Sequence, residues 1–253
     1  LYGVIDSNLN EVIPCCFREL EYIEESHLFK TEKGYKDTSG RFVAECDGKK
    51  IYVPSKYLYC KSFNNGSAVA VLKAWPENRY ALINDEAGDI IPPIFDSLTL
   101  LSNGSYKFKL NDKYGLIDNT GRIILPNKYH AIGKFVDNLA CARVDVKSAD
   151  SNKETNLYGY IDLQGNEVLP VEYEFIGKRF NRRTVVMKGG EWCLFGIDDH
   201  KLTAFPGVAH LGPCVSDDMC KINLGGKYDK GNNRVTGGLW GYCSVDGKTV
   251  IEA

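Results

Sequence analysis

The sequence predicts an all-β fold built from tandem repeats. The chain has 25 Gly, 15 Tyr and 11 Phe among 253 residues but only 2 Met, a composition that favours short strands joined by tight turns. No window carries a clean helical stripe of apolar residues; residues 17–28 come closest and could form one or two helical turns. A short motif recurs along the chain, and this third observation also sets the domain organisation.

The motif is an aromatic residue and Gly, two apolar residues and Asp, with a proline eight residues after the Asp. Three full copies have Tyr2, Gly3, Asp6 and Pro14; Tyr114, Gly115, Asp118 and Pro126; and Tyr158, Gly159, Asp162 and Pro170. Looser copies run from Asn84 to Pro92 and from Asp198 to Pro206. Two divergent copies place Glu45 and Ser244 at the Asp position, and the second of these carries the pair Trp240-Gly241.

These copies make residues 1–253 a single array, with units of about 40 residues that start near 1, 41, 80, 113, 157, 192 and 239, the last one partial. Such units suit an open, solenoid-like stack of antiparallel hairpins or, alternatively, a β-propeller. The chain begins and ends with the same hairpin, which favours the open array. Both ends fall at a repeat hairpin and no initiator Met is present, so we expect a fragment or a processed chain.

Each position of the motif has a physical interpretation. The Gly lets a neighbouring backbone approach closely, and the Asp side chain accepts a backbone N–H two residues later, with Gly closing the turn. Proline is expected to end the strand that follows the turn. Another aromatic lies three residues beyond the proline and should share the core with the aromatic of the pair: Phe17, Tyr57, Phe95, Tyr129 and Tyr173.

The second half of each unit is a tight turn that feeds another strand, at residues 63–71, 101–110 and 135–144. By the same pattern Phe180 is expected to be buried. The units differ in length mainly at residues 145–156 and 223–238, which are polar and expected to be exposed.

With these residues in place, the sequence resembles the bacterial WG repeat, which is named for its Trp-Gly pair. The resemblance rests on aromatic-Gly-x-Ile-Asp, on Gly-x-x-apolar-apolar-Pro and on the aromatic that follows, and it covers the whole chain. It implies a bacterial array of β repeats of the kind regarded as interaction modules, and it brings no catalytic residues with it.

No other motif in the sequence indicates a specific binding site or catalytic site. The net charge of −2 argues against a nucleic-acid surface, and no apolar run is long enough to span a bilayer. Phosphate-binding loops are missing, and the repeated Asp is better explained as a turn residue than as a calcium ligand. The one catalytic pairing that the sequence offers is a thiol nucleophile at Cys214 or Cys220 with His210 as its base, and the motif gives it no support. We therefore expect no catalytic, cofactor-binding or metal-binding residues.

The nine cysteines are odd in number and scattered, which favours a reducing, cytoplasmic compartment and leaves the cell envelope or secretion open. The expected function is a non-enzymatic repeat module that binds or scaffolds a protein partner. The alternative is a carbohydrate-binding or envelope-binding repeat domain, in which repeated aromatics stack on sugars.

Overall fold

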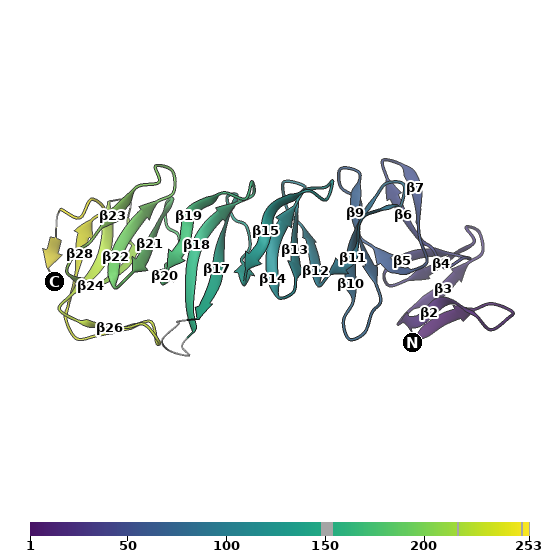
Figure 1. Ribbon diagram of the computed structural model, residues 1–253, viewed down its shortest axis with the longest axis horizontal. Helices are drawn as coiled ribbons and strands as arrows, with labels where there is room; N and C mark the ends of the chain where they lie inside the picture. Colours follow the sequence, from purple (N-terminus) through teal and green to yellow (C-terminus); the bar gives the residue numbers. More distant parts are fainter. Residues whose placement is uncertain (148–153, 217, 249, 253) are drawn as a thin grey trace. The chain divides into compact units, whose positions relative to one another are not determined.

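The computed structural model describes residues 1–147, 154–216, 218–248 and 250–252. The chain is 62% strand, and its paired strands are antiparallel, which confirms the all-β repeat array. Residues 17–28 contain a strand instead of helical turns, and no helix in the described ranges could cross a membrane. The chain divides into two compact units, Leu1–Lys128 and Tyr129–Ala253, which we describe separately (Figure 1).

The first unit begins with a hairpin of β1 (Tyr2–Ile5) and β2 (Glu11–Phe17). A five-stranded sheet follows, with β3 (Leu20–Ile23), β4 (Leu28–Thr31), β5 (Gly34–Asp37), β6 (Phe42–Cys46) and β7 (Lys49–Val53) in chain order. Next comes a sheet of β8 (Tyr57–Cys60), β9 (Ser67–Leu72), β10 (Arg79–Asn84) and β11 (Asp89–Phe95). The last sheet holds β12 (Ser97–Leu100), β13 (Tyr106–Leu110), β14 (Lys113–Ile117) and β15 (Ile123–Tyr129).

The second unit repeats the four-stranded arrangement. Its first sheet holds β16 (Ala131–Ile132), β17 (Leu139–Lys147), β18 (Glu154–Asp162) and β19 (Glu167–Tyr173). Its second holds β20 (Phe175–Ile176), β21 (Arg183–Lys188), β22 (Glu191–Gly196) and β23 (Leu202–Ala204). Its third holds β24 (Val208–Cys214), β25 (Met219–Leu224), β28 (Leu239–Ser244) and β29 (Val250–Glu252). A separate hairpin joins β26 (Lys227–Asp229) to β27 (Arg234–Thr236).

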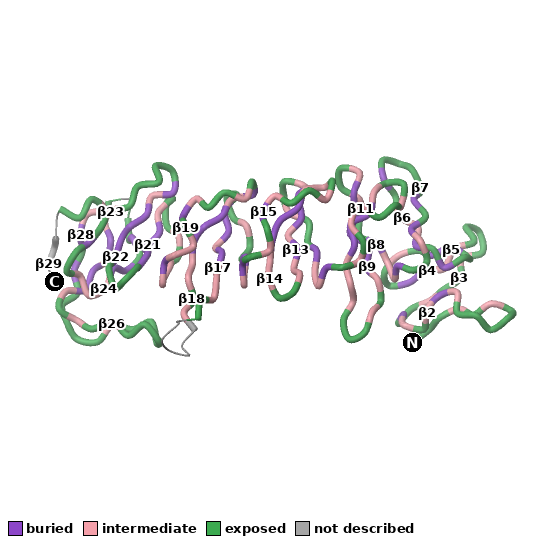
Figure 2. The backbone as a smooth tube through the Cα atoms, in the orientation of Figure 1, coloured by how far each residue is buried: buried purple, intermediate pink, exposed green. Residues whose placement is uncertain are grey.

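Within each unit the core lies between successive sheets. In the first unit, Val53 of β7 belongs to the same buried cluster as Ala70 and Ala81 of the following sheet. In the second unit, Trp192 of β22 clusters with Leu211 and Ile222 of the next sheet. The buried residues lie mostly within strands, whereas the turns that join the strands are largely exposed (Figure 2). Each sheet therefore covers the face of its neighbour, as expected for a repeat array.

The glycine of the motif lies opposite a β-bulge. Tyr2 pairs with Phe17 and Val4 with Ile13, so Gly3 faces the three residues between Ile13 and Phe17. A Cβ atom on Gly3 would lie 2.6 Å from the Ile13 carbonyl oxygen. The same approach recurs at Gly115, 2.6 Å from the oxygen of Leu125, and at Gly159, 2.6 Å from the oxygen of Pro170. No side chain fits where two backbones come this close.

The expectation that the proline ends its strand is wrong. Pro14, Pro126 and Pro170 lie inside β2, β15 and β19. At Pro14 and Pro170 the register shifts, and the bulge leaves the proline outside the ladder. The missing N–H is therefore no obstacle, and the strand continues to the aromatic three residues later.

The Asp of the motif closes its turn with side-chain hydrogen bonds. Asp118 Oδ1 accepts the backbone N–H groups of Thr120 and Arg122, both at 2.9 Å, and Asp6, Asn84 and Asp162 make the same two bonds. In the unit expected to start near residue 41, this residue is Asp37. The assignment of Glu45 is therefore wrong, because the two turn hydrogen bonds of the motif are made by Asp37.

The last two copies of the motif, at Asp198 and at Ser244, close this turn in different ways. Ser244 Oγ accepts the N–H of Lys248, as the expected position requires. At the preceding copy Asp198 instead pairs with Arg182, and the turn N–H of Lys201 is accepted by Asp199. The turn in this copy has thus moved by one residue.

The two sets of motif aromatics differ in burial. Those three residues after the proline are buried: Phe17, Tyr57, Phe95, Tyr129 and Tyr173. The aromatics before the Gly are not core residues as expected, because Tyr2 is 60% exposed and Trp240 37% exposed, while Tyr114 and Tyr158 are half-buried. Phe180, which was expected to be buried, is also exposed. It forms a backbone bridge with Arg183, as Val136 does with Leu139 in the previous repeat.

The two polar segments contain strand. Residues 145–147 and 154–156 extend β17 and β18, and residues 148–153 lie outside the described ranges. Residues 223–238 were expected to be exposed, but Asn223 is fully buried. The side-chain N–H of Asn223 donates to Gly237 O, and its Oδ1 accepts the backbone N–H of Gly226. These two bonds close the base of the β26–β27 hairpin.

Candidate functional site

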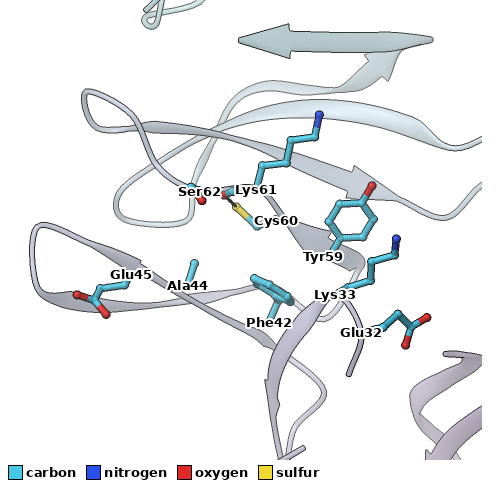
Figure 3. Close-up of a pocket in the computed structure, with 9 residues that line it drawn as sticks. All are labelled: Glu32, Lys33, Phe42, Ala44, Glu45, Tyr59, Cys60, Lys61 and Ser62. Atoms are coloured by element: carbon cyan, nitrogen blue, oxygen red, sulfur yellow. Dashed lines mark hydrogen bonds between the residues drawn. The ribbon is translucent and has the colours of Figure 1, made fainter. Parts of the chain in front are cut away.

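A cavity of the first unit lies between two of its sheets. It has a volume of about 520 Å³ and is bordered by β6, by β8 with the two residues after it, and by the β4–β5 turn (Figure 3). The lining residues are Glu32, Lys33, Phe42, Ala44, Glu45, Tyr59, Cys60, Lys61 and Ser62. We call this cavity the β6–β8 groove.

The floor of the β6–β8 groove is apolar. Phe42 and Cys60 are buried, and Ala44 and Tyr59 pack against the same core cluster. Burial raises the pKa of the Cys60 thiol to about 12, and its Sγ donates a hydrogen bond to the carbonyl of Lys61 at 3.0 Å. Because only the thiolate is a good nucleophile, Cys60 serves here as an apolar surface.

Charged side chains form the rim of the groove. Lys33 Nζ lies 5.5 Å from the centre of the Tyr59 ring. The Glu32 carboxylate accepts the backbone N–H groups of Arg18 and Glu19, and these bonds, that of Arg18 first, lower its pKa. The side chains of Lys61 and Glu45 form no hydrogen bond or ion pair with any described residue. The groove therefore combines an apolar floor with two charged side chains, those of Lys61 and Glu45, that have no partner among the described residues.

A second cavity, of about 380 Å³, lies in the second unit beside β19 and β22. Two of its rim charges are already paired, because Lys188 Nζ lies 2.9 Å from Glu172 Oε2. This bond raises the pKa of Lys188. The cavity thus offers a ligand less free charge than the β6–β8 groove.

The proposed pair of a thiol and His210 does not assemble. Cys214 and Cys220 pair with each other as a disulfide. The His210 ring stacks on Tyr228 at 5.2 Å and meets Trp192 edge-on at 4.6 Å. Its Nδ1 is buried without a partner, and burial, followed by the nearby Lys221 charge, lowers its pKa. His210 is therefore a neutral member of an aromatic cluster.

Sequence reasoning missed the groove residues. Lys33, Glu45 and Lys61 belong to separate segments that only the packing of β8 against β6 brings together. Among the described residues no three His, Cys, Asp or Glu side chains gather into a metal-binding group.

Comparisons with known proteins identify the repeat. The family described as "WG containing repeat" matches residues 80–114, 114–147 and 158–192. No curated protein matches the sequence. Solved structures similar in part include the tricorn protease, with 12% identity over 98% of this chain and 27% of that chain and a TM-score of 0.35. A eukaryotic initiation factor has 8% identity over 96% of this chain and 80% of that chain, with a TM-score of 0.35. The AfRom2 CNH domain has 9% identity over 95% of this chain and 85% of that chain, with a TM-score of 0.30.

Proposed function

Because the chain carries WG repeats, we propose that it is a non-enzymatic module that binds a protein partner, and that the β6–β8 groove is its binding site. Repeat arrays suit this role because every unit adds surface without needing a deep pocket of its own. The observation that carries the proposal is the apolar floor of the groove beside Lys61 and Glu45, two charges without a partner among the described residues.

A photo-crosslinking amino acid placed at Ser62 tests this proposal in the native host. We expect it to capture one protein, and the Lys61→Glu variant to lose that product. Lys134 is an exposed residue of the second unit with no described partner, so the same cross-linker there and the Lys134→Glu variant serve as matched controls. Capture of the same protein from both positions, or no effect of Lys61→Glu, would show that the groove is not the site.

A second candidate function, glycan binding, is favoured by a row of side chains on the five-stranded sheet. Tyr35 pairs with Val43, and Val43 pairs with Tyr52, so the three lie in one line on one face. Tyr35 and Tyr52 are 43% and 44% exposed, and exposed aromatic faces stack well on apolar or cationic groups. Binding of the chain on a glycan array, abolished by Tyr35→Ala and Tyr52→Ala but not by Lys61→Glu, would support this alternative.

A further inference from the structure

We propose that the ligand of the β6–β8 groove is an extended acidic peptide segment that adds to the outer edge of β8 as a fifth strand. This inference rests on the proposed function and specifies how the partner is held. It follows from three observations: an unpaired strand edge, a side-chain wall opposite it, and two exposed lysine side chains on the rim.

The strand edge is the outer side of β8. β8 is the terminal strand of its sheet and pairs with β9 through Tyr59↔Val71 and Cys60↔Ala70. The N–H of Lys61 bonds Val69 O at 2.9 Å and so points toward β9. Because backbone groups alternate in direction along an antiparallel strand, the N–H and C=O of Cys60 point the other way, toward the groove.

This edge is open over a defined length. No described strand pairs with the outer side of β8, and the register shift between Tyr57 and Tyr59 interrupts the strand at its start. The usable edge therefore runs from Tyr59 to Ser62, about 10 Å at 3.3 Å per residue. An extended segment of about four to six residues matches that length.

The opposite wall offers side chains in place of backbone groups. β6 is paired on one side with β5 and on the other with β7, so its backbone cannot take another strand. Its Phe42 and Ala44 face the groove instead. An added strand would hydrogen-bond to β8 and turn alternate side chains toward this apolar wall, the mode by which peptides extend open sheets.

The charges select the partner. Lys33 and Lys61 border the groove together with Glu32 and Glu45, but the Glu32 carboxylate already accepts two backbone N–H groups. The Glu32 carboxylate keeps its charge, but its oxygens are already occupied, so the two ammonium groups face only one carboxylate, that of Glu45, whose oxygens have no hydrogen-bond donor among the described residues. An acidic side chain on the ligand complements this rim, and a basic one meets like charge.

A selection from random octapeptides displayed on phage tests the inference on the intact chain, with the Lys33→Glu/Lys61→Glu variant as counter-target. Both lysines lie at the surface, so we expect this variant to melt like the wild type. The enriched peptides should alternate apolar and polar residues and carry Asp or Glu. The best peptide is then synthesised with its backbone amides methylated at odd or at even positions.

An added strand donates N–H groups to β8 from every second residue only. One methylated series should therefore lose affinity by about tenfold or more, since each hydrogen bond contributes about 1 kcal/mol, and the other series should keep it. Equal binding by both series would overturn strand addition, as would a selection that returns no acidic peptides dependent on Lys33 and Lys61. Continued partner capture at Ser62 in either case would leave the proposed function standing, whereas loss of that capture alone would refute it separately.

Discussion

The hydroxyl of Tyr57, at the start of β8, donates a 2.6 Å hydrogen bond to Oδ1 of Asp89, at the start of β11 on the opposite edge of the same sheet. Tyr57 shares a buried cluster with Ala68, Ala70 and Ala81, whose small side chains leave room for its ring to cross the sheet. The second unit has the same bond, from Tyr129 to Glu167 at 2.7 Å.

The bond belongs to the repeat. Asp89 and Glu167 each stand five residues after the turn residue of their own motif, and the preceding aromatic is Tyr in both cases. Where that aromatic is Phe95, the corresponding position holds Ile123. The hydroxyl and the acid thus occur together in these two repeats and are both missing from the pair Phe95 and Ile123, whereas Tyr173 has Thr203 at the corresponding position.

Tyr57→Phe removes this bond and keeps the ring. We expect a loss of about 2 kcal/mol in the free energy of unfolding, because the bond reaches an ionised acceptor from a buried donor. Urea unfolding measures the change. Tyr52→Phe, at an exposed ring on β7, is the control; an equal effect of both substitutions would mean that the Asp89 contact contributes nothing.

Gly159→Ala tests the close approach opposite the bulge. Its Cβ would meet the carbonyl oxygens of Leu169 and Pro170, and neither backbone atom can move without breaking the hairpin. We expect a loss of about 3 kcal/mol or more. Gly133→Ala is the matched control, since its Cβ would lie 3.5 Å from the nearest atom. Similar melting temperatures for the two variants would contradict this explanation of the motif.

Asp118→Asn should change stability by less than about 0.5 kcal/mol, because Asn84 already closes the equivalent turn with the same acceptor atom. Asp118→Ala, in contrast, leaves the N–H groups of Thr120 and Arg122 without their acceptor and should cost about 1 kcal/mol. Thermal melts of both variants decide. A large loss with Asn would show that the negative charge of Asp118 has a role beyond the turn.

The sequence predicted the parts of this fold that depend on local chemistry. The turn bonds of Asp118 and Asp162 follow from one side chain and its near neighbours, and the burial of Tyr57 follows from its repeat position. Proline was predicted to end its strand because it has no N–H to donate to the neighbouring strand. Inside the bulge at Pro14 the ladder needs no donor at that position.

Three features were not predicted from the sequence. Asp37 was missed because Lys33 stands where its motif should have an aromatic, and Glu45 was taken as the turn residue instead. The β6–β8 groove was missed because its charges are far apart in the chain and resemble ordinary surface residues. Lys36 was overlooked for the same reason, although it is completely buried.

Lys36 makes a pH-dependent contribution to stability. Its Nζ donates to Gly40 O at 2.9 Å and to Tyr57 O at 3.4 Å, and burial lowers its pKa from 10.5 to about 8. The unfolded chain holds this proton up to about pH 10.4, whereas the folded chain releases it from about pH 8. Between these values the unfolded state binds more protons, so this group's contribution to the free energy of unfolding rises with pH.

The whole protein should show the opposite trend above about pH 9, because burial raises the pKa values of Cys60, Cys141 and Cys193 and the unfolded chain loses those protons first. The contribution of Lys36 is therefore measured as a difference, by urea unfolding of the wild type and of Lys36→Met at pH 7 and pH 10. We expect wild-type stability to improve relative to the variant by roughly 1 to 3 kcal/mol over that range. A difference that stays constant with pH would show that Lys36 keeps an ordinary pKa and that its amine is hydrated in solution.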